Sequence, residues 1–140
     1  MRFGIHAGLW MDNWTDDPAP LFDKAARIGF DGVELSLLGI GPDKAARLRE
    51  AAAASGVALT CSTGLGPGED PSSADPAVRA KAREALARAI ETAAAMGSSG
   101  LAGVVAASWG VFDPANKTDR AKRSAETLGQ MQDHLAQHGV

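Results

Sequence analysis

The chain has 140 residues, of which 45% are hydrophobic and 22% are charged, and its formal net charge is -3 with a pI near 5.5. This is the composition of one globular domain or a piece of one, and it argues against nucleic acid as a partner, because 14 basic residues are interleaved with 17 acidic ones. No apolar run approaches the roughly 20 residues of a membrane span, and the single cysteine, Cys61, excludes an internal disulfide. We therefore expect no membrane segment and a cytoplasmic location.

The first half of the chain predicts two strand–helix units. Residues 2–9 mix β-branched and apolar residues, which predicts a strand, and residues 18–30 carry apolar side chains at helical spacing. Residues 31–38 predict the second strand. A helix is predicted over residues 41–56, because a proline stands near its first turn and a glycine at its end.

The second half of the chain predicts two more units. Residues 57–63 predict the third strand, which a Gly/Pro/Ser-rich loop over residues 64–74 follows. An aspartate at the N-cap and a proline at the first helical position open the longest predicted helix, residues 76–96. Residues 100–108 predict the fourth strand. A fourth continuous helix is predicted from about residue 121 to a glycine at residue 139.

Strand and helix thus alternate four times, which predicts parallel strands joined by right-handed crossovers. Because the strand segments are short and nearly all apolar, we expect both of their faces to be buried. A TIM barrel needs eight such units in about 250 residues, and Gly139 and Val140 repeat the step that opens the earlier strands. We therefore expect an α/β fold of four consecutive βα units over residues 1–140, the N-terminal half of a TIM (β/α)8 barrel. A complete, open four-stranded α/β domain is the alternative.

All three tryptophans follow strands of this predicted half-barrel. Trp10 and Trp14 follow the first strand and Trp109 the fourth, which places them at the carboxyl ends where barrel active sites lie. Aromatic rings suit the C–H faces of sugars, because they bury apolar area and leave the hydroxyls to polar partners. Since strands one and four are not neighbours in a closed barrel, we expect Trp14 and Trp109 to face each other across the mouth. Capping of the barrel core is the alternative, and it is the interpretation that we favour for Trp10.

Few acid–base groups lie at this mouth. Glu34 stands near the end of the second strand in an apolar run, where a carboxylate is costly unless it has a ligand or an ion pair. His6 in the first strand either points into the mouth or satisfies a hydrogen bond in the core, and Asp12 and Asp113 stand in loops. Because proton abstraction from a sugar carbon needs several convergent carboxylates and histidines, we expect a pocket wall and no catalytic residue in this chain.

Three weaker patterns carry no functional prediction. "GLGPG" at residues 64–68 lacks the Lys-Ser/Thr ending of a P-loop, and "AASWG" around Ser108 lacks the first glycine of a nucleophile elbow. His134 and His138 have the spacing of metal ligands on one helix, but the residues between them lack the glutamate of a metalloprotease motif. We therefore expect a plain loop, a structural serine and two solvated histidines, with no metal ligand in this chain.

Five segments of the chain resemble the ketose 3-epimerases of the D-tagatose/D-psicose (allulose) type, in the xylose isomerase-like barrel superfamily. They are "MRFGIHAGLWMDNW", "ARIGFDGVEL", "GVALTCSTGLG", "SSADPAVRAKA" and "GLAGVVAASWGVFD". The resemblance runs through all 140 residues and matches the N-terminal half of the family. It implies a sugar isomerase or epimerase acting on a small-molecule ketose, with this half inactive alone.

The resemblance also implies which residues bind the sugar. Trp14, Gly64 and Trp109 match pocket-lining positions of the family, Glu34 matches a carboxylate on its second strand, and His6 stands where the family usually has an aromatic residue. "VVAASWG" in place of the family's typical "GALYSYW" implies a roomier pocket near the fourth strand.

The family's cofactor is a divalent metal ion, commonly manganese, with magnesium or cobalt as alternatives. It chelates the oxygens at C2 and C3 of the ketose, while one glutamate removes the C3 proton to give an enediolate and a second returns a proton on the other face. The metal ligands and both glutamates of the family lie on strands five to eight, beyond Val140, so none is assigned to this chain.

Two other functions compete with this interpretation. A non-catalytic half-barrel would self-associate or dock on a partner, because it exposes the edges of strands one and four and an apolar inner face. A homo-oligomer, or pairing through these edges, is therefore expected. The endonuclease branch of the same superfamily is disfavoured, because it draws metal-binding histidines from this half and strands two to four carry none.

Overall fold

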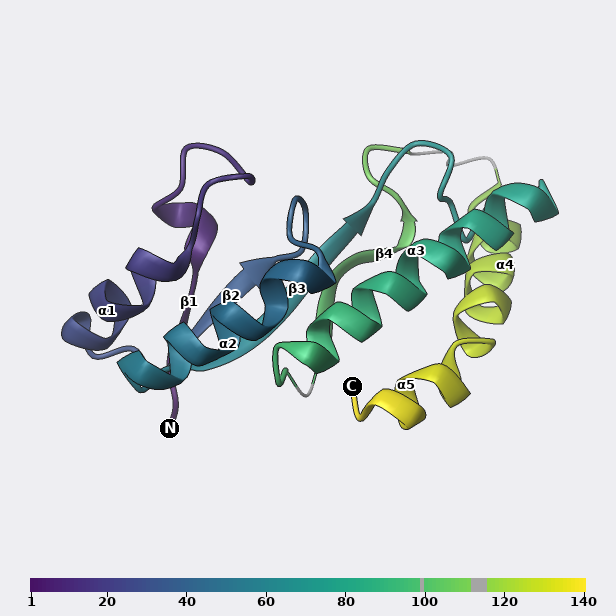
Figure 1. Ribbon diagram of the computed structural model, residues 1–140. Coiled ribbons are helices and arrows are strands. Elements are labelled where there is room, and N and C mark those ends of the chain that lie inside the picture. Colours follow the sequence, from purple (N-terminus) through teal and green to yellow (C-terminus); the bar gives the residue numbers. More distant parts are fainter. Residues whose placement is uncertain (99, 112–115) are drawn as a thin grey trace.

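A computed structural model describes residues 1–98, 100–111 and 116–140 of the chain (Figure 1). Its strands are β1 (Gly4–His6), β2 (Gly32–Ser36), β3 (Ala58–Leu65) and β4 (Leu101–Ser108). Its helices are η1 (Ala7–Leu9, a 3-10 turn), α1 (Ala19–Ile28), α2 (Pro42–Ser55), α3 (Pro76–Ala95), α4 (Lys117–Gly129) and α5 (Gln132–His138). Among these described segments, no helix has the length and apolarity that crossing a bilayer requires.

The four strands form one parallel sheet in the order β1-β2-β3-β4. Figure 1 shows α1, α2 and α3 side by side along one face of this sheet. A doubly wound domain reverses its strand order and places helices on both faces, whereas consecutive order with helices on one face is the wall of a barrel. The expected α/β fold, four βα units corresponding to half of a TIM barrel, is confirmed.

The main core lies between the sheet and these helices. Val33 and Leu35 of β2 and Cys61 of β3 are buried against Phe22 of α1 and Leu48 of α2. Burying a side chain the size of Phe22 or Leu48 contributes roughly 1.5–3 kcal/mol, so this layer stabilises the helices on the sheet. The core therefore holds one face of each strand and leaves the other free to form a site.

The expectation that both faces of the strands are buried is wrong. Exposure alternates along β2, and the residues of β4 from Ala102 to Val104 are exposed. The face turned away from the helices carries small and polar side chains, with His6, Glu34 and Thr60 in one row across three strands. The inner face is therefore mixed, because Val33 and Leu35 of β2 point to the helices while Val104 of β4 lines the other face beside these polar groups.

The first strand ends earlier than predicted. At His6 the imidazole Nδ1 accepts a hydrogen bond of 3.0 Å from the backbone N–H of Gly8 and caps the 3-10 turn η1. A side-chain cap of this kind gives the backbone a partner outside the sheet, so the chain turns after residue 6.

The predicted fourth helix consists of two helices, α4 and α5. The break falls just after Gly129, where glycine is a poor helix former, and Met131 between the two helices is buried. Met131 packs with Leu86 and Ile90 of α3, and this contact turns α5 toward α3. The predicted end at Gly139 is confirmed, since this residue has a φ of 68° and caps α5.

The loop between β3 and α3 is held by α4. Asp70 accepts hydrogen bonds from the hydroxyl of Ser72 at 2.6 Å and from Nη2 of Arg120 at 2.8 Å. Arg123 donates to the carbonyl of Ser72, and Thr127 donates to a carbonyl of the same loop. These bonds fix residues 70–72 of the loop to α4.

Candidate functional site

A pocket of about 460 Å³ opens at the carboxyl ends of the strands, on the face of the sheet turned away from the helices. All five residues that the sequence predicts for sugar binding line it. They are His6, Trp14, Glu34, Gly64 and Trp109. The residues come from β1, the loop after it, β2, β3 and the turn after β4, so the sheet brings together positions up to 103 residues apart, from residue 6 to residue 109.

His6 points into this pocket from the last position of β1. Because Nδ1 accepts the Gly8 N–H, a neutral imidazole carries its proton on Nε2. Nε2 lies 3.7 Å from Oε1 of Glu34, and about a third of each side chain is exposed. Of the two sequence alternatives for His6, the structure places the ring in the mouth, and its hydrogen bond is a local one to the Gly8 N–H and not one in the core.

Glu34 takes its place from the alternation of β2. Its neighbours Val33 and Leu35 point into the core, so the carboxylate between them points to the opposite face and into the pocket. The 3.7 Å between its Oε1 and Nε2 of His6 is too long for a hydrogen bond. The carboxylate therefore keeps acceptor positions for the hydroxyls of a ligand.

Two tryptophans line the pocket from the two edges of the sheet. The Trp14 ring meets the His6 ring edge to face, with centroids 5.9 Å apart, and the Trp14 residue is about half exposed. Trp109 is 70% exposed, and its backbone N–H donates to the carbonyl of Leu65 at 2.9 Å. A Cβ on Gly64 would lie 3.8 Å from the Trp109 ring, an ordinary van der Waals distance, so the indole lies close to the Gly64 backbone of β3. Two exposed aromatic faces are therefore available to an apolar ligand surface.

Trp10 has the packing role that the sequence favours. Its ring lies 6.3 Å from that of Phe30, and Nζ of Lys24 lies 4.3 Å from the ring centroid. Trp10 packs against the main core and is not among the residues that line the pocket.

Gly8 sets the distance between His6 and Trp14. A Cβ at this position would come within 2.9 Å of both His6 Nδ1 and Trp14 Cζ3, closer than such atoms approach. Only glycine therefore allows the loop after β1 to place the histidine and the tryptophan against each other.

Sequence reasoning missed the hydroxyl groups of the pocket. Ser36 and Ser62 line it, and each stands two positions from a predicted residue, Glu34 or Gly64. Period-two alternation from Glu34 and Gly64 is the signal that identifies the serines, and it carries no information when both strand faces are expected to be buried. Asp12 is exposed and not part of the lining, and Asp113 lies outside the described residues.

Ser108 has a structural role. Its residue is 3% exposed, and its hydroxyl donates to the carbonyl of Gly66 at 2.8 Å. This bond ties the end of β4 to the loop after β3, which agrees with the rejection of a nucleophile elbow at this position.

The pocket does not fit a complete divalent metal site. Among its described lining residues, His6 and Glu34 alone have side chains of the types that commonly bind metals in such centres. A catalytic centre of this kind takes three protein ligands and an open position. The described lining therefore supplies no more than two of the ligands that such a centre needs.

The fold and the position of the pocket define a TIM-barrel protein with its site at the carboxyl ends of the strands. The chain belongs to the xylose isomerase-like TIM barrel family, whose pattern matches residues 22–140.

Its relatives with known activities are sugar epimerases. The chain is 30% identical over 142 residues to the L-ribulose 3-epimerase of Methylomonas sp. (strain DH-1) and 26% identical over 145 residues to the D-psicose 3-epimerase of Agrobacterium fabrum (strain C58). The matches cover 100% of this chain but 49% and 50% of those proteins, so the chain spans about half the length of the curated relatives.

Solved structures agree with this assignment. A D-psicose 3-epimerase crystallised in the presence of D-fructose superimposes with a TM-score of 0.91 at 26% identity, over 100% of this chain and 50% of that one. An L-ribulose 3-epimerase superimposes with a TM-score of 0.86 at 31% identity, over 99% of this chain and 47% of that one. The four βα units thus match half of an epimerase barrel.

Proposed function

We propose that this chain forms the aromatic wall of the sugar pocket of a ketose 3-epimerase. The observation that carries the proposal is the convergence of His6, Trp14, Glu34, Gly64 and Trp109 on one pocket at the carboxyl ends of the strands. The activities of the relatives, which are 3-epimerases of ketoses, support the substrate class.

In this proposal the pocket binds a ketose through both apolar and polar contacts. The indole faces of Trp14 and Trp109 cover C–H faces of the sugar. Glu34 accepts hydrogen bonds from hydroxyls, and the Nε2–H of His6 donates one. Glu34 is held by β2, the His6 ring by the Gly8 N–H and Trp109 by its backbone bond to Leu65, so these groups lose little side-chain freedom when the sugar binds.

We also propose that the chemistry needs groups outside this chain. Inversion at a sugar carbon takes a base on one face and an acid on the other, whereas the described pocket offers one carboxylate, Glu34, and one imidazole, His6. The acid–base glutamates and the ligands of a divalent manganese, magnesium or cobalt ion would come from the part of the barrel that the relatives have beyond this half. The chain alone is then a binding wall without turnover.

Titration of the purified chain with D-fructose and D-tagatose, followed by tryptophan fluorescence, tests the binding role. We expect saturable quenching that Trp10→Phe retains and that Trp14→Ala or Trp109→Ala removes, because Trp10 lies outside the pocket. Quenching that is lost in Trp10→Phe alone, or no saturable signal in any form, would overturn the proposed pocket.

Assays with added manganese test the need for outside groups. We expect no epimerisation of D-fructose or D-tagatose by the purified chain. Robust turnover by these 140 residues would contradict the proposal that the catalytic groups lie elsewhere.

The edges of the sheet support a second candidate function, that of a self-associating half-barrel. We propose that copies pair through β1 and β4, which lie at the two edges of the described sheet. Phe3, beside β1, is 60% exposed, and Val104 of β4 is 39% exposed, so apolar side chains accompany the free edges. Light scattering checks this: a dimer mass is expected, and a single monomer mass across concentrations would rule the pairing out.

A further inference from the structure

Helix α5 packs firmly on α3, on the side of the sheet away from the sugar pocket. Met131 is 6% exposed and lies in an apolar cluster with Leu86 and Ile90 of α3, and Leu135 of α5 packs against the same cluster. This packing fixes the facing surfaces of the two helices, so polar side chains at their rim have defined neighbours.

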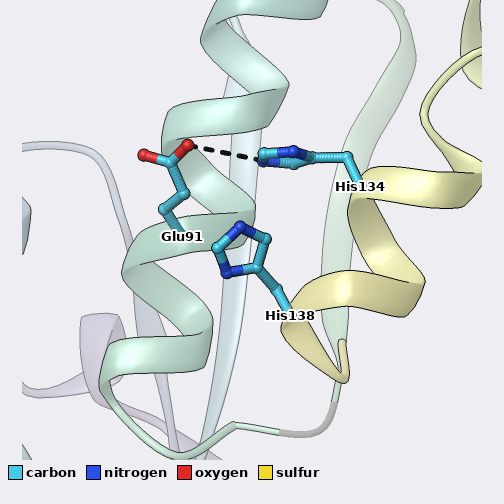
Figure 2. A group of neighbouring side chains, drawn as sticks. All are labelled: Glu91, His134 and His138. Atoms are coloured by element: carbon cyan, nitrogen blue, oxygen red, sulfur yellow. Dashed lines mark ion pairs between the residues drawn. The ribbon is translucent and has the colours of Figure 1, made fainter.

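Three side chains of types that can bind metal ions meet at that rim. His134 and His138 stand one turn apart on α5, with ring centroids 4.6 Å apart, and Glu91 stands near the end of α3. Figure 2 shows the three side chains reaching into the space between the helices, with the Glu91 carboxylate directed at the His134 ring. One ligand atom from each residue lies within 4.8 Å of the other two.

The contact between His134 and Glu91 lacks a hydrogen bond. Nε2 of His134 lies 3.4 Å from Oε1 of Glu91, yet this nitrogen is buried without a hydrogen-bond partner in the described structure. A buried polar atom without a partner is costly, and it is uncommon in folded proteins. The expectation that both histidines are solvated is therefore wrong for Nε2 of His134, which is buried against α3 although 27% of the side chain is exposed.

We propose that Glu91, His134 and His138 form a binding site for a divalent transition-metal ion of the zinc class. Ligand atoms bonded at about 2.0–2.1 Å in a tetrahedral zinc site lie about 3.4 Å apart, which is the separation of the His134 and Glu91 atoms. His138 is exposed and free to rotate, so its ring closes the remaining distance. Two histidines and one glutamate, with water in the fourth position, are a known zinc ligand set.

This site is separate from the sugar pocket. The two share no residue, and α3 runs antiparallel to the strands, so Glu91 in its last turns lies toward the amino ends of the strands. Arg88 stands one turn before Glu91 on α3, and its Nη2 lies 3.8 Å from Oε1 of Glu69 in the loop between β3 and α3. An ion held here joins α3 to α5 and stabilises the C-terminal helix on the barrel wall.

Calorimetric titration of the metal-stripped chain with Zn²⁺ tests the site. We expect one ion per chain, and an affinity that falls about tenfold or more in each of Glu91→Gln, His134→Gln and His138→Gln, since even indirect supports of metal ligands cost this much when removed. Co²⁺ in place of Zn²⁺ is expected to give visible absorption bands of tetrahedral form, which the same variants lose.

Two control variants keep the test specific. Glu84→Gln removes an exposed carboxylate two turns earlier on α3, and His6→Gln removes the histidine of the other His–Glu pair, so both are expected to bind Zn²⁺ like the parent chain. Zn²⁺ should raise the melting temperature of the parent but not that of His138→Gln, whose exposed side chain leaves the fold intact. No stoichiometric binding, or binding that Glu91→Gln leaves unchanged, would overturn the three-residue site.

Discussion

His6 and Glu34 face each other at one level of the sheet, with Nε2 of the histidine 3.7 Å from Oε1 of the glutamate. The register of the parallel strands sets this relationship, because the two residues are direct partners in the pairing of β1 with β2. The Gly8 N–H holds the far side of the imidazole. A proton donor and a carboxylate acceptor are therefore in place before any ligand arrives.

Replacing Glu34 by glutamine is expected to weaken ketose binding about tenfold, which corresponds to about 1.4 kcal/mol. The physical reason is that hydrogen bonds to a carboxylate are stronger than those to a neutral amide. Tryptophan fluorescence titration with D-fructose measures the change. Glu50→Gln on the exposed side of α2 is the matched control, and an equal loss in both variants would contradict a binding role for Glu34.

Gly8→Ala is expected to displace Trp14 and to weaken ketose binding while the chain stays folded. The added methyl group would lie 2.9 Å from both His6 Nδ1 and Trp14 Cζ3, so one ring must move. Circular dichroism checks the fold, and fluorescence titration checks the binding. Gly129→Ala, where a Cβ meets nothing within 4 Å, is the control. Unchanged affinity in Gly8→Ala would show that the spacing of the two rings is irrelevant.

Stability at low pH is expected to depend on Asp70. Burial raises the pKa of this carboxyl, but the hydrogen bonds from Ser72 and Arg120 outweigh burial and hold the pKa below its ordinary value of 3.8. Because the folded pKa lies below the unfolded one, the stabilisation is complete well above 3.8 and is lost as the pH falls through the folded pKa.

Asp70→Asn should therefore lower the free energy of unfolding by about 1–3 kcal/mol at neutral pH, because it weakens the bond to Arg120 in a buried setting. Urea denaturation at several pH values measures this, and the difference from the parent chain should shrink below a pH of about 4. Asp12→Asn, at an exposed position, should change stability by no more than about 0.5 kcal/mol. A difference for Asp70→Asn that is constant with pH would rule out the ionised carboxylate as its cause.

Cys61 is expected to resist thiol reagents in the folded chain. Burial raises the pKa of its thiol to about 11; the negative charge of Glu34 also raises this pKa, and the hydrogen bond with Ser98 lowers it by less. Little thiolate therefore forms near neutral pH. Ellman's reagent should find no reactive thiol in buffer and one per chain in denaturant. Since the ordinary pKa is 9.0, unfolding should also become easier as the pH rises from about 9 toward 11. Fast reaction of the folded chain would contradict burial of Cys61.

Local patterns along the chain were enough to predict most of the fold. Asp75 caps α3 by accepting the Ala77 N–H at 2.8 Å, and glycines in the left-handed region end α1 and α2, as their sequence positions predict. Where tertiary contacts compete with local preference, prediction was less accurate. The His6 cap shortened the first strand, and burial of Met131 divided the last helix.

The residues of the candidate site were likewise predicted in part from the sequence and in part only from the structure. Residue types and their places at strand ends indicated His6, Trp14, Glu34 and Trp109 as pocket candidates, because parallel strands bring their carboxyl ends to one edge, and the resemblance to the ketose 3-epimerases added Gly64.

Only the tertiary structure decided which face each strand residue occupies, because that depends on which side the helices cover. It turned Ser36 and Ser62 into the pocket. It also brought together Glu91 and His134, which are 43 positions apart in the sequence. This contact depends on how α5 packs against α3, and no local pattern specifies that packing.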